Sequence, residues 1–141
     1  MKTIALRFGE HFAPPCGTIQ AHQEIINKLG YVWYGKLGSK ISAKITDEIL
    51  KTEEPRILLI CSGRAGRYWA YISAISDECP KRGTSPDYYR DKTEKIKTWF
   101  KVVRFERAES GIMSKCTVTS SGSTLSEASK HSMSPYFKID V

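Results

Sequence analysis

A short apolar run in the middle of the chain limits the possible folds most. Ile57 to Cys61 are five consecutive apolar residues, bounded by Pro55 and by the glycines of residues 62–66. Five residues are too few for a stable helix, whereas a strand covered on both faces has about this length. Residues 67–76 then alternate apolar side chains between two faces, so the two segments predict a β-hairpin with residues 62–66 as its turn.

Capping residues indicate where short helices begin and end. Thr18 and Thr46 are suitable N-caps, Gly30 is a suitable left-handed terminator, and Thr124-x-x-Glu127 forms a capping box. The expected helices cover residues 18–29, 47–51 and 124–131, and the expected strands cover residues 2–8, 31–36, 57–61, 67–76, 98–107, 115–119 and 135–141.

The order of these elements predicts one α+β domain over residues 1–141. A chain of 141 residues can bury a sizeable core without disulfides or metals, and no internal repeat interrupts it. We expect a curved mixed β-sheet or pseudo-barrel of about five to six strands flanked by short helices. Residues 77–97 stand out as a long polar insertion that is broken by prolines and a glycine, and insertions of this length often carry function.

Cysteine spacing and hydropathy predict a cytoplasmic protein. The four cysteines are scattered without C-x-x-C spacing, which indicates reduced thiols and no zinc site. No apolar run reaches the length of a membrane helix, and the first residues lack the apolar core of a signal peptide. We therefore expect neither a membrane partner nor a metal or other cofactor.

The charge of the chain favours a polyanionic partner. It carries 22 Lys and Arg against 15 Asp and Glu, a formal net charge of +7. Residues 81–107 hold nine basic and four acidic side chains, so 9 − 4 = +5 of this excess lies within one segment. Such a concentration promotes binding to nucleic acid through counterion release.

Catalytic motifs are absent from the sequence. It contains no G-x-S-x-G, Walker or H-E-x-x-H pattern, and its three histidines lie far apart. His11 is the best-placed histidine for a function, His22 lies on the apolar stripe of its helix, and His131 suits a helix C-terminus. We expect no catalytic residue and no enzymatic activity.

Two tyrosines and a tryptophan follow directly after the expected helix end, in the segment Gly30-Tyr31-Val32-Trp33-Tyr34-Gly35-Lys36. Aromatic residues at a strand start usually pack into the core, but flat rings on a basic background also suit a pocket for a nucleic-acid base. Trp69 and Trp99 lie within expected strands among apolar neighbours, where packing in the sheet is the simpler interpretation.

The order of elements, together with three segments, resembles the PUA-like superfamily, and within it the EVE and YTH domains that read modified bases in DNA or RNA. Gly30 to Trp33 resembles their glycine-to-tryptophan step, Ile57 to Tyr68 resembles their apolar strand with its serine and glycine turn, and Thr98 to Phe105 is similar to the strand after their insertion. The resemblance covers nearly the whole chain. It implies that the ligand is a modified base, in most cases a methylated one, held in an aromatic cage.

The resemblance also implies the residues that contact the base. It makes Trp33 one wall, Tyr88 or Tyr89 the second wall, and Tyr34 a contact to the base edge. The loop of residues 9–12 would contact the base from above, but Glu10 and His11 stand where the family has asparagine-like groups. Methylated adenine, methylated or hydroxymethylated cytosine, and another modified base therefore all stay open. The expected base-binding residues are Trp33, Tyr34, Tyr88, Tyr89, Glu10, His11 and Ser62.

Phosphate contacts are expected from basic residues near this pocket. Arg64 and Arg67 flank a tight turn, which presents side chains outward, and we add Lys36 and Arg90 to the set. Because domains of this kind occur fused to nucleases or encoded beside them, the resemblance also implies a nuclease partner in a restriction-like or defence system. One alternative is a small ASCH-like ribonuclease or amidohydrolase on the same fold, although its Gly-x-Lys-x-x-Glu-x-Arg pattern is absent. Another is a protein-interaction module whose positive surface serves solubility or binds an acidic partner.

Overall fold

A computed structural model describes residues 1–9, 13–61 and 66–141 of the chain. Its element order is β1 (Lys2–Phe8), α1 (Thr18–Leu29), β2 (Val32–Leu37), α2 (Ala43–Leu50), β3 (Arg56–Cys61), β4 (Arg67–Ser76), the 3-10 helix η1 (Asp87–Lys95), β5 (Ile96–Arg107), α3 (Ile112–Lys115), β6 (Thr117–Val118), α4 (Leu125–His131) and β7 (Tyr136–Asp140).

One mixed sheet contains all seven strands, in the order β2-β5-β4-β3-β1-β7-β6. The β1–β3 pair is parallel and the other pairs are antiparallel. The sheet is open, with β2 and β6 at its edges, so the α+β architecture is confirmed as a curved sheet that does not close into a barrel. It has seven strands because the two-residue strand β6 and the last strand β7 both join it.

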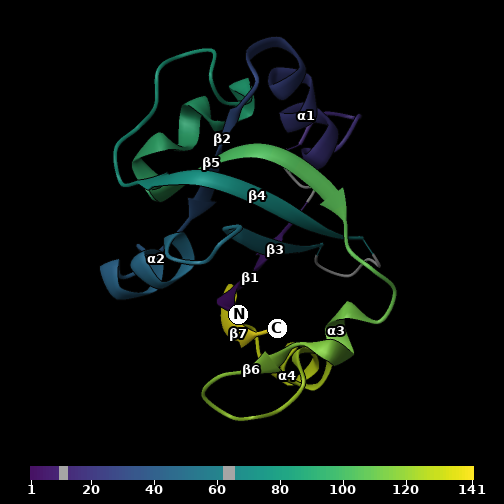
Figure 1. Ribbon diagram of the computed structural model, residues 1–141. Helices are drawn as coiled ribbons and strands as arrows, with labels where there is room; N and C mark the ends of the chain where they lie inside the picture. The colour runs from purple at the N-terminus through teal and green to yellow at the C-terminus, as the bar shows by residue number, and fades with distance from the viewer. Residues whose placement is uncertain (10–12, 62–65) are drawn as a thin grey trace.

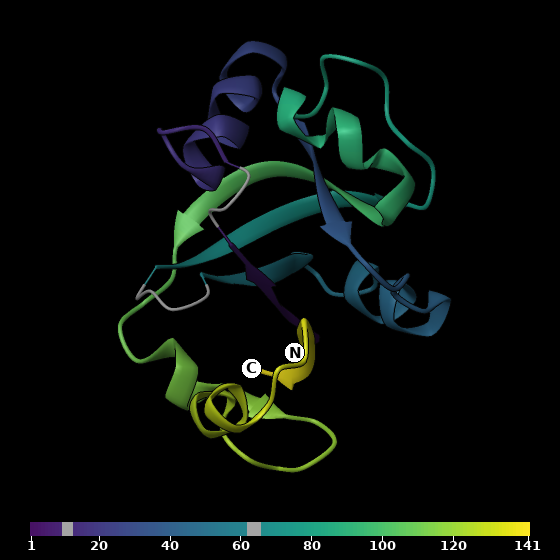
Figure 2. The ribbon, with the colours of Figure 1, turned by 180° about the vertical axis from the view of Figure 1, so that it is seen from behind.

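Helices cover the two ends of the sheet. α1 and η1 lie together near the β2 edge, whereas α3 and α4 lie at the β6 end (Figures 1 and 2). The two termini lie side by side, and the Met1 amino group donates a 3.2 Å hydrogen bond to the carbonyl of Val141. No helix in the described part of the chain is long and apolar enough to cross a membrane.

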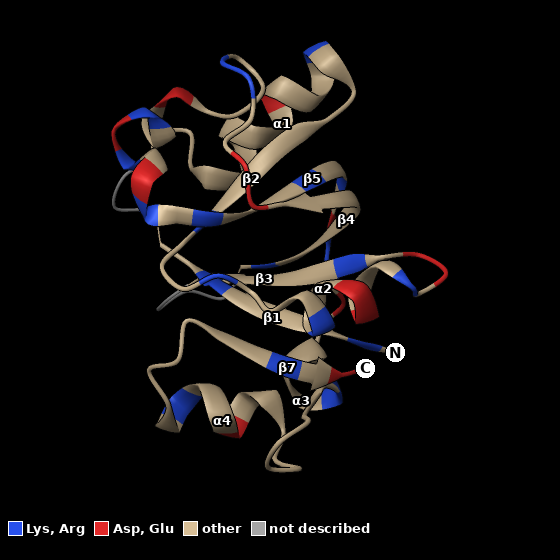
Figure 3. Ribbon diagram, turned by 90° about the vertical axis from the view of Figure 1, so that its left-hand side faces the viewer, with Lys and Arg blue, Asp and Glu red and all other residues tan. Residues whose placement is uncertain are grey.

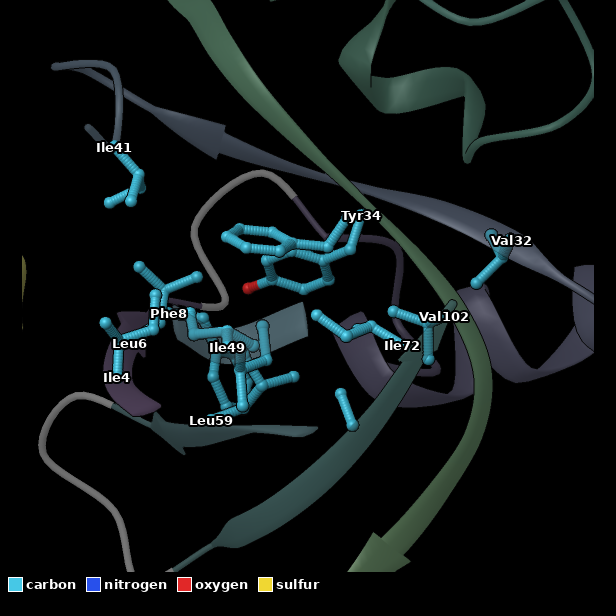
Figure 4. Packing of buried hydrophobic residues seen from close by; sticks show 13 residues of the cluster. Ile4, Leu6, Phe8, Val32, Tyr34, Ile41, Ile49, Leu59, Ile72 and Val102 are labelled. Atoms are coloured by element: carbon cyan, nitrogen blue, oxygen red, sulfur yellow. The ribbon is translucent and has the colours of Figure 1, made fainter. Parts of the chain in front are cut away.

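Alternation along the strands divides the core between the two faces of the sheet. In β3, Ile57 and Leu59 belong to a cluster beneath α1 and α2, whereas Leu58 and Ile60 belong to a cluster beneath α3 and α4. All four side chains are buried, which confirms the covered strand expected from the apolar run. Figure 4 shows the first cluster, in which Tyr34 of β2 lies among aliphatic side chains from neighbouring strands.

The central hairpin forms as expected but contains an irregularity. β3 and β4 pair in antiparallel register, and Trp69 is buried on the face opposite Ala70 and Ile72. The register between β4 and β5 shifts twice, between Tyr71 and Ile72 and again between Ile72 and Ala74, where β4 contains one extra residue. Because such a bulge reverses the facing of later residues, Ile75 packs against the same cluster as Ile72, and the prediction that it faces the other side is wrong.

Two helix caps differ from the sequence prediction. Thr18 is the first helical residue and not the N-cap, since its hydroxyl donates to the carbonyl of Gly9 at 3.4 Å and leaves Gly17 at the cap position. Ser42, and not Thr46, caps α2 by accepting a 3.4 Å hydrogen bond from the Ile45 amide. The Thr124 cap and the left-handed Gly30 terminator are confirmed.

The long insertion is more regular than the prolines suggested. Residues 87–95 form η1, which packs against the β2 edge, and β5 begins directly after it. The Trp33 amide donates a 2.8 Å hydrogen bond to the Thr84 carbonyl, and the Gly38 amide donates a 3.0 Å hydrogen bond to the Lys95 carbonyl. The insertion therefore satisfies edge groups of β2 that would otherwise be open to another strand.

Replacing Gly35 with alanine should destabilise this edge. An added Cβ would lie 2.9 Å from Ile96 Cδ1 and 3.0 Å from Trp99 Cζ3, and both of these side chains are buried. We expect Gly35→Ala to lower the free energy of unfolding by about 1–3 kcal/mol, measured by urea denaturation. Gly66→Ala is the matched control, because its Cβ would meet Tyr68 at an ordinary 3.5 Å. Equal stability of the two variants would contradict the packing of Gly35 described here.

Candidate functional site

The candidate site lies where β2, α1 and η1 meet at the edge of the sheet. Strand alternation directs Tyr34 and Lys36 to one face of β2 and Trp33 and Gly35 to the other. Tyr34 accordingly joins the cluster beneath α1, whereas Trp33 packs with Tyr88 against the buried side chains of Tyr89, Ile96 and Trp99. One strand thus supplies residues both to the site and to the packing behind it.

A buried hydrogen-bonded series connects α1 to η1. His22 Nδ1 lies 2.8 Å from the carbonyl oxygen of Thr18, and His22 Nε2 lies 3.0 Å from the hydroxyl of Tyr89. A carbonyl oxygen only accepts, so Nδ1 carries the proton and Nε2 accepts from the tyrosine hydroxyl. This arrangement fixes one neutral tautomer of His22, and its exposure of 0% confirms the expected core position.

Burial shifts the pKa of both members of this pair in the direction that disfavours the charged form. Desolvation lowers the pKa of His22 from 6.5 to about 4, and the bond to the Thr18 carbonyl opposes that shift. Desolvation also raises the pKa of Tyr89 well above its usual value, and the nearby Tyr34 and Tyr88 add to the shift. Both groups are therefore neutral at pH 7, so the pair holds η1 against α1 without placing a charge in the core.

Beside this pair lies a cavity of about 210 Å³, which we call the tyrosine pocket. The ring of Tyr34 lies 4.9 Å from that of His22, and the rings of Tyr88 and Tyr89 lie 4.8 Å apart. A cavity of about 150 Å³ is large enough for benzene, so this one has room for a single planar ring system. Its lining residues are Leu6, Arg7, Phe8, Gly9, Ala13, Thr18, Tyr34, Gly35, Lys36, Leu37, Tyr88, Tyr89, Lys92 and Pro135.

Cations line the tyrosine pocket, and no carboxylate does among the residues that the structure describes. Arg7 lines the pocket from β1 but directs its guanidinium to the other face of the sheet, where it donates to the carbonyls of Ser129, Ser132 and Ser134 at 2.7–3.0 Å. Lys36 Nζ donates to the carbonyls of Leu37 and Ser39 at 3.2 and 2.8 Å. Carbonyl partners fix Lys36 without neutralising it, so this side chain brings positive charge to the pocket.

Burial acts on the charge of Lys36. The residue is only 3% exposed, and desolvation lowers its pKa from the usual value for lysine. Its ammonium also lies 5.3 Å from the centre of the Tyr136 ring, which attracts a cation through its π face. The two carbonyls and the ring favour the protonated form, so Lys36 presents a fixed charge at the pocket wall.

The structure brings some of the expected site residues together and separates others. Tyr34, Tyr88, Tyr89 and Lys36 all line the tyrosine pocket. Trp33 packs in the cluster that also holds Tyr88 but does not line the pocket, so its role as a cage wall stays a prediction.

The expected phosphate contacts are more dispersed. Arg90 is exposed and pairs with Asp87 at 3.6 Å, away from the pocket lining. Arg67 lies in a separate hollow that it shares with Arg107. Glu10, His11, Ser62 and Arg64 lie outside the described residues, although Gly9 and Ala13, on either side of the first gap, both line the pocket.

The sequence did not predict several pocket residues, among them Arg7, Phe8 and Lys92. Arg7 and Phe8 belong to β1, which the sequence marked only as an apolar strand, and their position depends on the parallel pairing of β1 with β3. Lys92 lies one turn after Tyr88 on η1, and its Nζ is 3.5 Å from the Tyr88 carbonyl. The sequence indicated Lys92 only as part of the basic charge of the insertion. It did not predict the helix η1, which directs Lys92 to the pocket.

A second hollow near α1 suits a ligand less well. It encloses about 610 Å³ beside Phe8 and Tyr68, and Pro14, Pro15 and Cys16 form part of its rim. None of its described lining residues is charged, and its larger, more open volume would not clamp a single ring. In the described part of the chain, no cluster of three or more His, Cys, Asp or Glu residues could hold a metal ion.

Comparison with known proteins identifies a family for this fold and this pocket. A family model described as Pua-like matches residues 4–136, which cover nearly the whole chain. Pua-like domains generally bind nucleic acid. Searches of curated proteins and of solved structures find no match.

The buried His22 should make stability depend on pH below neutrality. The unfolded chain binds a proton on this residue near pH 6.5, whereas the folded chain does so only near pH 4. The contribution of neutral His22 to the free energy of unfolding is therefore fully present above pH 6.5. It falls as the pH is lowered toward 4, by about 3 kcal/mol at most.

We expect His22→Phe to remove this pH dependence from the free energy of unfolding, measured by urea denaturation between pH 7 and pH 4. His131→Gln is the matched control, because His131 is exposed and bonded only to the exposed Glu127 in the described structure. Its pH profile should follow that of the wild type. An unchanged profile in His22→Phe would contradict the neutral, buried state of His22.

Proposed function

Because the chain belongs to the Pua-like family, we propose that it binds nucleic acid by taking one modified base into the tyrosine pocket. Within the family we place it with the EVE and YTH type of reader. We further propose that it acts without catalysis of its own and directs a nuclease or a defence system to modified strands. The observation that carries this proposal is a cavity of base size with aromatic rings and the fixed cation Lys36 in its wall.

The rings supply the affinity for a base. Stacking of a base on an aromatic side chain contributes about 1–3 kcal/mol, and Tyr34, Tyr88 and Phe8 each present a ring to the pocket. The Tyr88 and Tyr89 rings are inclined by 42°, so only one of them can stack flat on the same base. We assign the stacking contact to Tyr88, since Tyr89 is buried and committed to His22.

A methyl group on the base adds apolar surface that the rings can cover. Discriminating one methyl group in such a pocket is worth about 1–3 kcal/mol, equivalent to about 5- to 150-fold in affinity. In a duplex the base must first leave the stack, which costs a few kcal/mol. The fixed charge of Lys36 helps to offset this cost by attracting the strand that carries the base.

A second candidate function is a hydrolase that uses Lys36. The observation in its favour is that burial lowers the pKa of this amine, and an amine with a lowered pKa can act as a base or nucleophile. Against it, the amine donates to two carbonyls, and no carboxylate or histidine among the described residues lines the pocket with it. Binding therefore fits the described site better than hydrolysis.

The binding proposal predicts a specific effect of Tyr88→Ala. We expect the wild type to prefer one modified strand over its plain counterpart in a panel of fluorescent hexamers whose central base is cytosine, 5-methylcytosine, 5-hydroxymethylcytosine, adenine or N6-methyladenine. Tyr88→Ala should weaken binding of the preferred strand by about 5- to 150-fold and abolish the preference, because it removes the stacking ring.

Tyr31→Ala is the matched control for this experiment. Tyr31 lies on the same edge of the sheet, but its ring contacts Lys101 at 4.6 Å and does not line the pocket. This variant should retain the preference. If Tyr88→Ala kept the preference, or if both variants lost it equally, the base would not bind in the tyrosine pocket.

The absence of catalysis is a separate prediction. We expect no hydrolysis of RNA or of an acylated nucleoside by the purified protein, monitored by gel electrophoresis and chromatography. Turnover that disappears in Lys36→Met but persists in Tyr31→Ala would contradict this expectation and establish the hydrolase.

A further inference from the structure

We propose that a groove lined by three lysines, next to the tyrosine pocket, binds the phosphodiester backbone of the strand whose base enters that pocket. The groove encloses about 520 Å³, and we call it the lysine groove. The inference rests on the proposed function, because it assumes that the partner is a nucleic-acid strand. The lining residues of the groove are Leu37, Gly38, Ser39, Lys92, Lys95 and Lys97.

The backbone on both sides of the lysine groove is fixed. Gly38 follows the last residue of β2 with a φ of +88°, a conformation that favours glycine, and its amide donates to the Lys95 carbonyl at 3.0 Å. Lys95 ends η1, and Lys97 is the second residue of β5. The lysines are therefore presented by a rigid junction of two elements and not by a free loop.

The charges of Lys95 and Lys97 are available to a ligand. Both side chains are exposed, and neither forms an ion pair with a residue that the structure describes. Other surface cations nearby are paired: Lys40 lies 2.9 Å from Asp77, and Arg90 lies 3.6 Å from Asp87. Figure 3 shows both basic and acidic residues along η1, whereas the first part of β5 carries basic ones.

The lysine groove adjoins the tyrosine pocket. Leu37 and Lys92 line both, so the two spaces share a wall. A nucleotide whose base lies between the tyrosines has its sugar and phosphates outside the pocket, beside this shared wall. Gly38 and Ser39 have small side chains, which allow a phosphate to approach the lysines closely. The lysine groove therefore suits the phosphates that flank the base, while the tyrosine pocket holds the base itself.

The double variant Lys95→Gln/Lys97→Gln tests the lysine groove. The probes are a plain thymidine hexamer, a hexamer with a central 5-methylcytosine, and the free 5-methylcytidine nucleoside. Each phosphate neutralised on a single strand contributes about 0.7 to the slope of log affinity against log salt. We expect the variant to lower the magnitude of this slope by about 1.4 and to weaken binding of both hexamers about 10-fold in low salt, without affecting any nucleoside binding.

Lys115→Gln/Lys130→Gln is the control pair. It removes the same charge from exposed lysines of α3 and α4, which lie at the other end of the sheet. Its salt slope should equal that of the wild type. A slope unchanged in the groove variant, or lowered equally in both pairs, would overturn the proposal, as would a wild-type protein that binds neither hexamer.

The outcome is separable from that of the base pocket. If hexamers bind with no preference for any modified base and Tyr88→Ala changes nothing, the proposed base recognition fails. A salt slope that still falls only in the groove variant would then support the lysine groove as a backbone site. If instead the base preference is present but the groove variant behaves as the control, the pocket stands and the lysine groove is overturned.

Discussion

The hydrogen bond between His22 and Tyr89 is the interaction on which the rest of the site depends. Both side chains are buried, so each polar group must find a partner inside the protein. A buried donor or acceptor left without one costs about 1–3 kcal/mol. Because His22 belongs to α1 and Tyr89 to η1, satisfying this pair also fixes the insertion against the first helix. The tyrosine pocket forms between the elements that this pair connects.

The edge strand β2 contributes to that arrangement on both of its faces. Tyr34, Gly35 and Lys36 line the pocket, while Trp33 packs on the opposite face, where Trp99 also lies against the Cβ position of Gly35. The outer edge of the strand would be open to association with another chain, but backbone hydrogen bonds from the insertion cover it. The insertion therefore serves two purposes, because it protects the sheet and supplies one wall of the pocket.

The sequence predicted the elements better than it predicted their geometry. Alternation in β3 and β4, the Gly30 terminator and the Thr124 cap depend on neighbouring residues, and short-range rules capture them. Which face of β2 lines the pocket depends on the pairing of β2 with β5, a strand far away in the sequence. Period-two alternation requires Trp33 and Tyr34 to face opposite sides, but it does not say which side holds the pocket. Likewise, no local signal predicts the bulge in β4, because it arises in the pairing with β5.

The two kinds of cation at this end of the molecule suit different tasks. Lys36 donates to carbonyl oxygens that hold it in place, so its ammonium need not move when a ligand arrives. Such preorganised charges lose little entropy on binding and add specificity of position. Lys95 and Lys97 are exposed and unpaired within the described structure, so they can follow a backbone of variable path. A fixed charge in the tyrosine pocket suits a base, which must fit closely. Adaptable charges in the lysine groove suit a strand, whose backbone can take several paths.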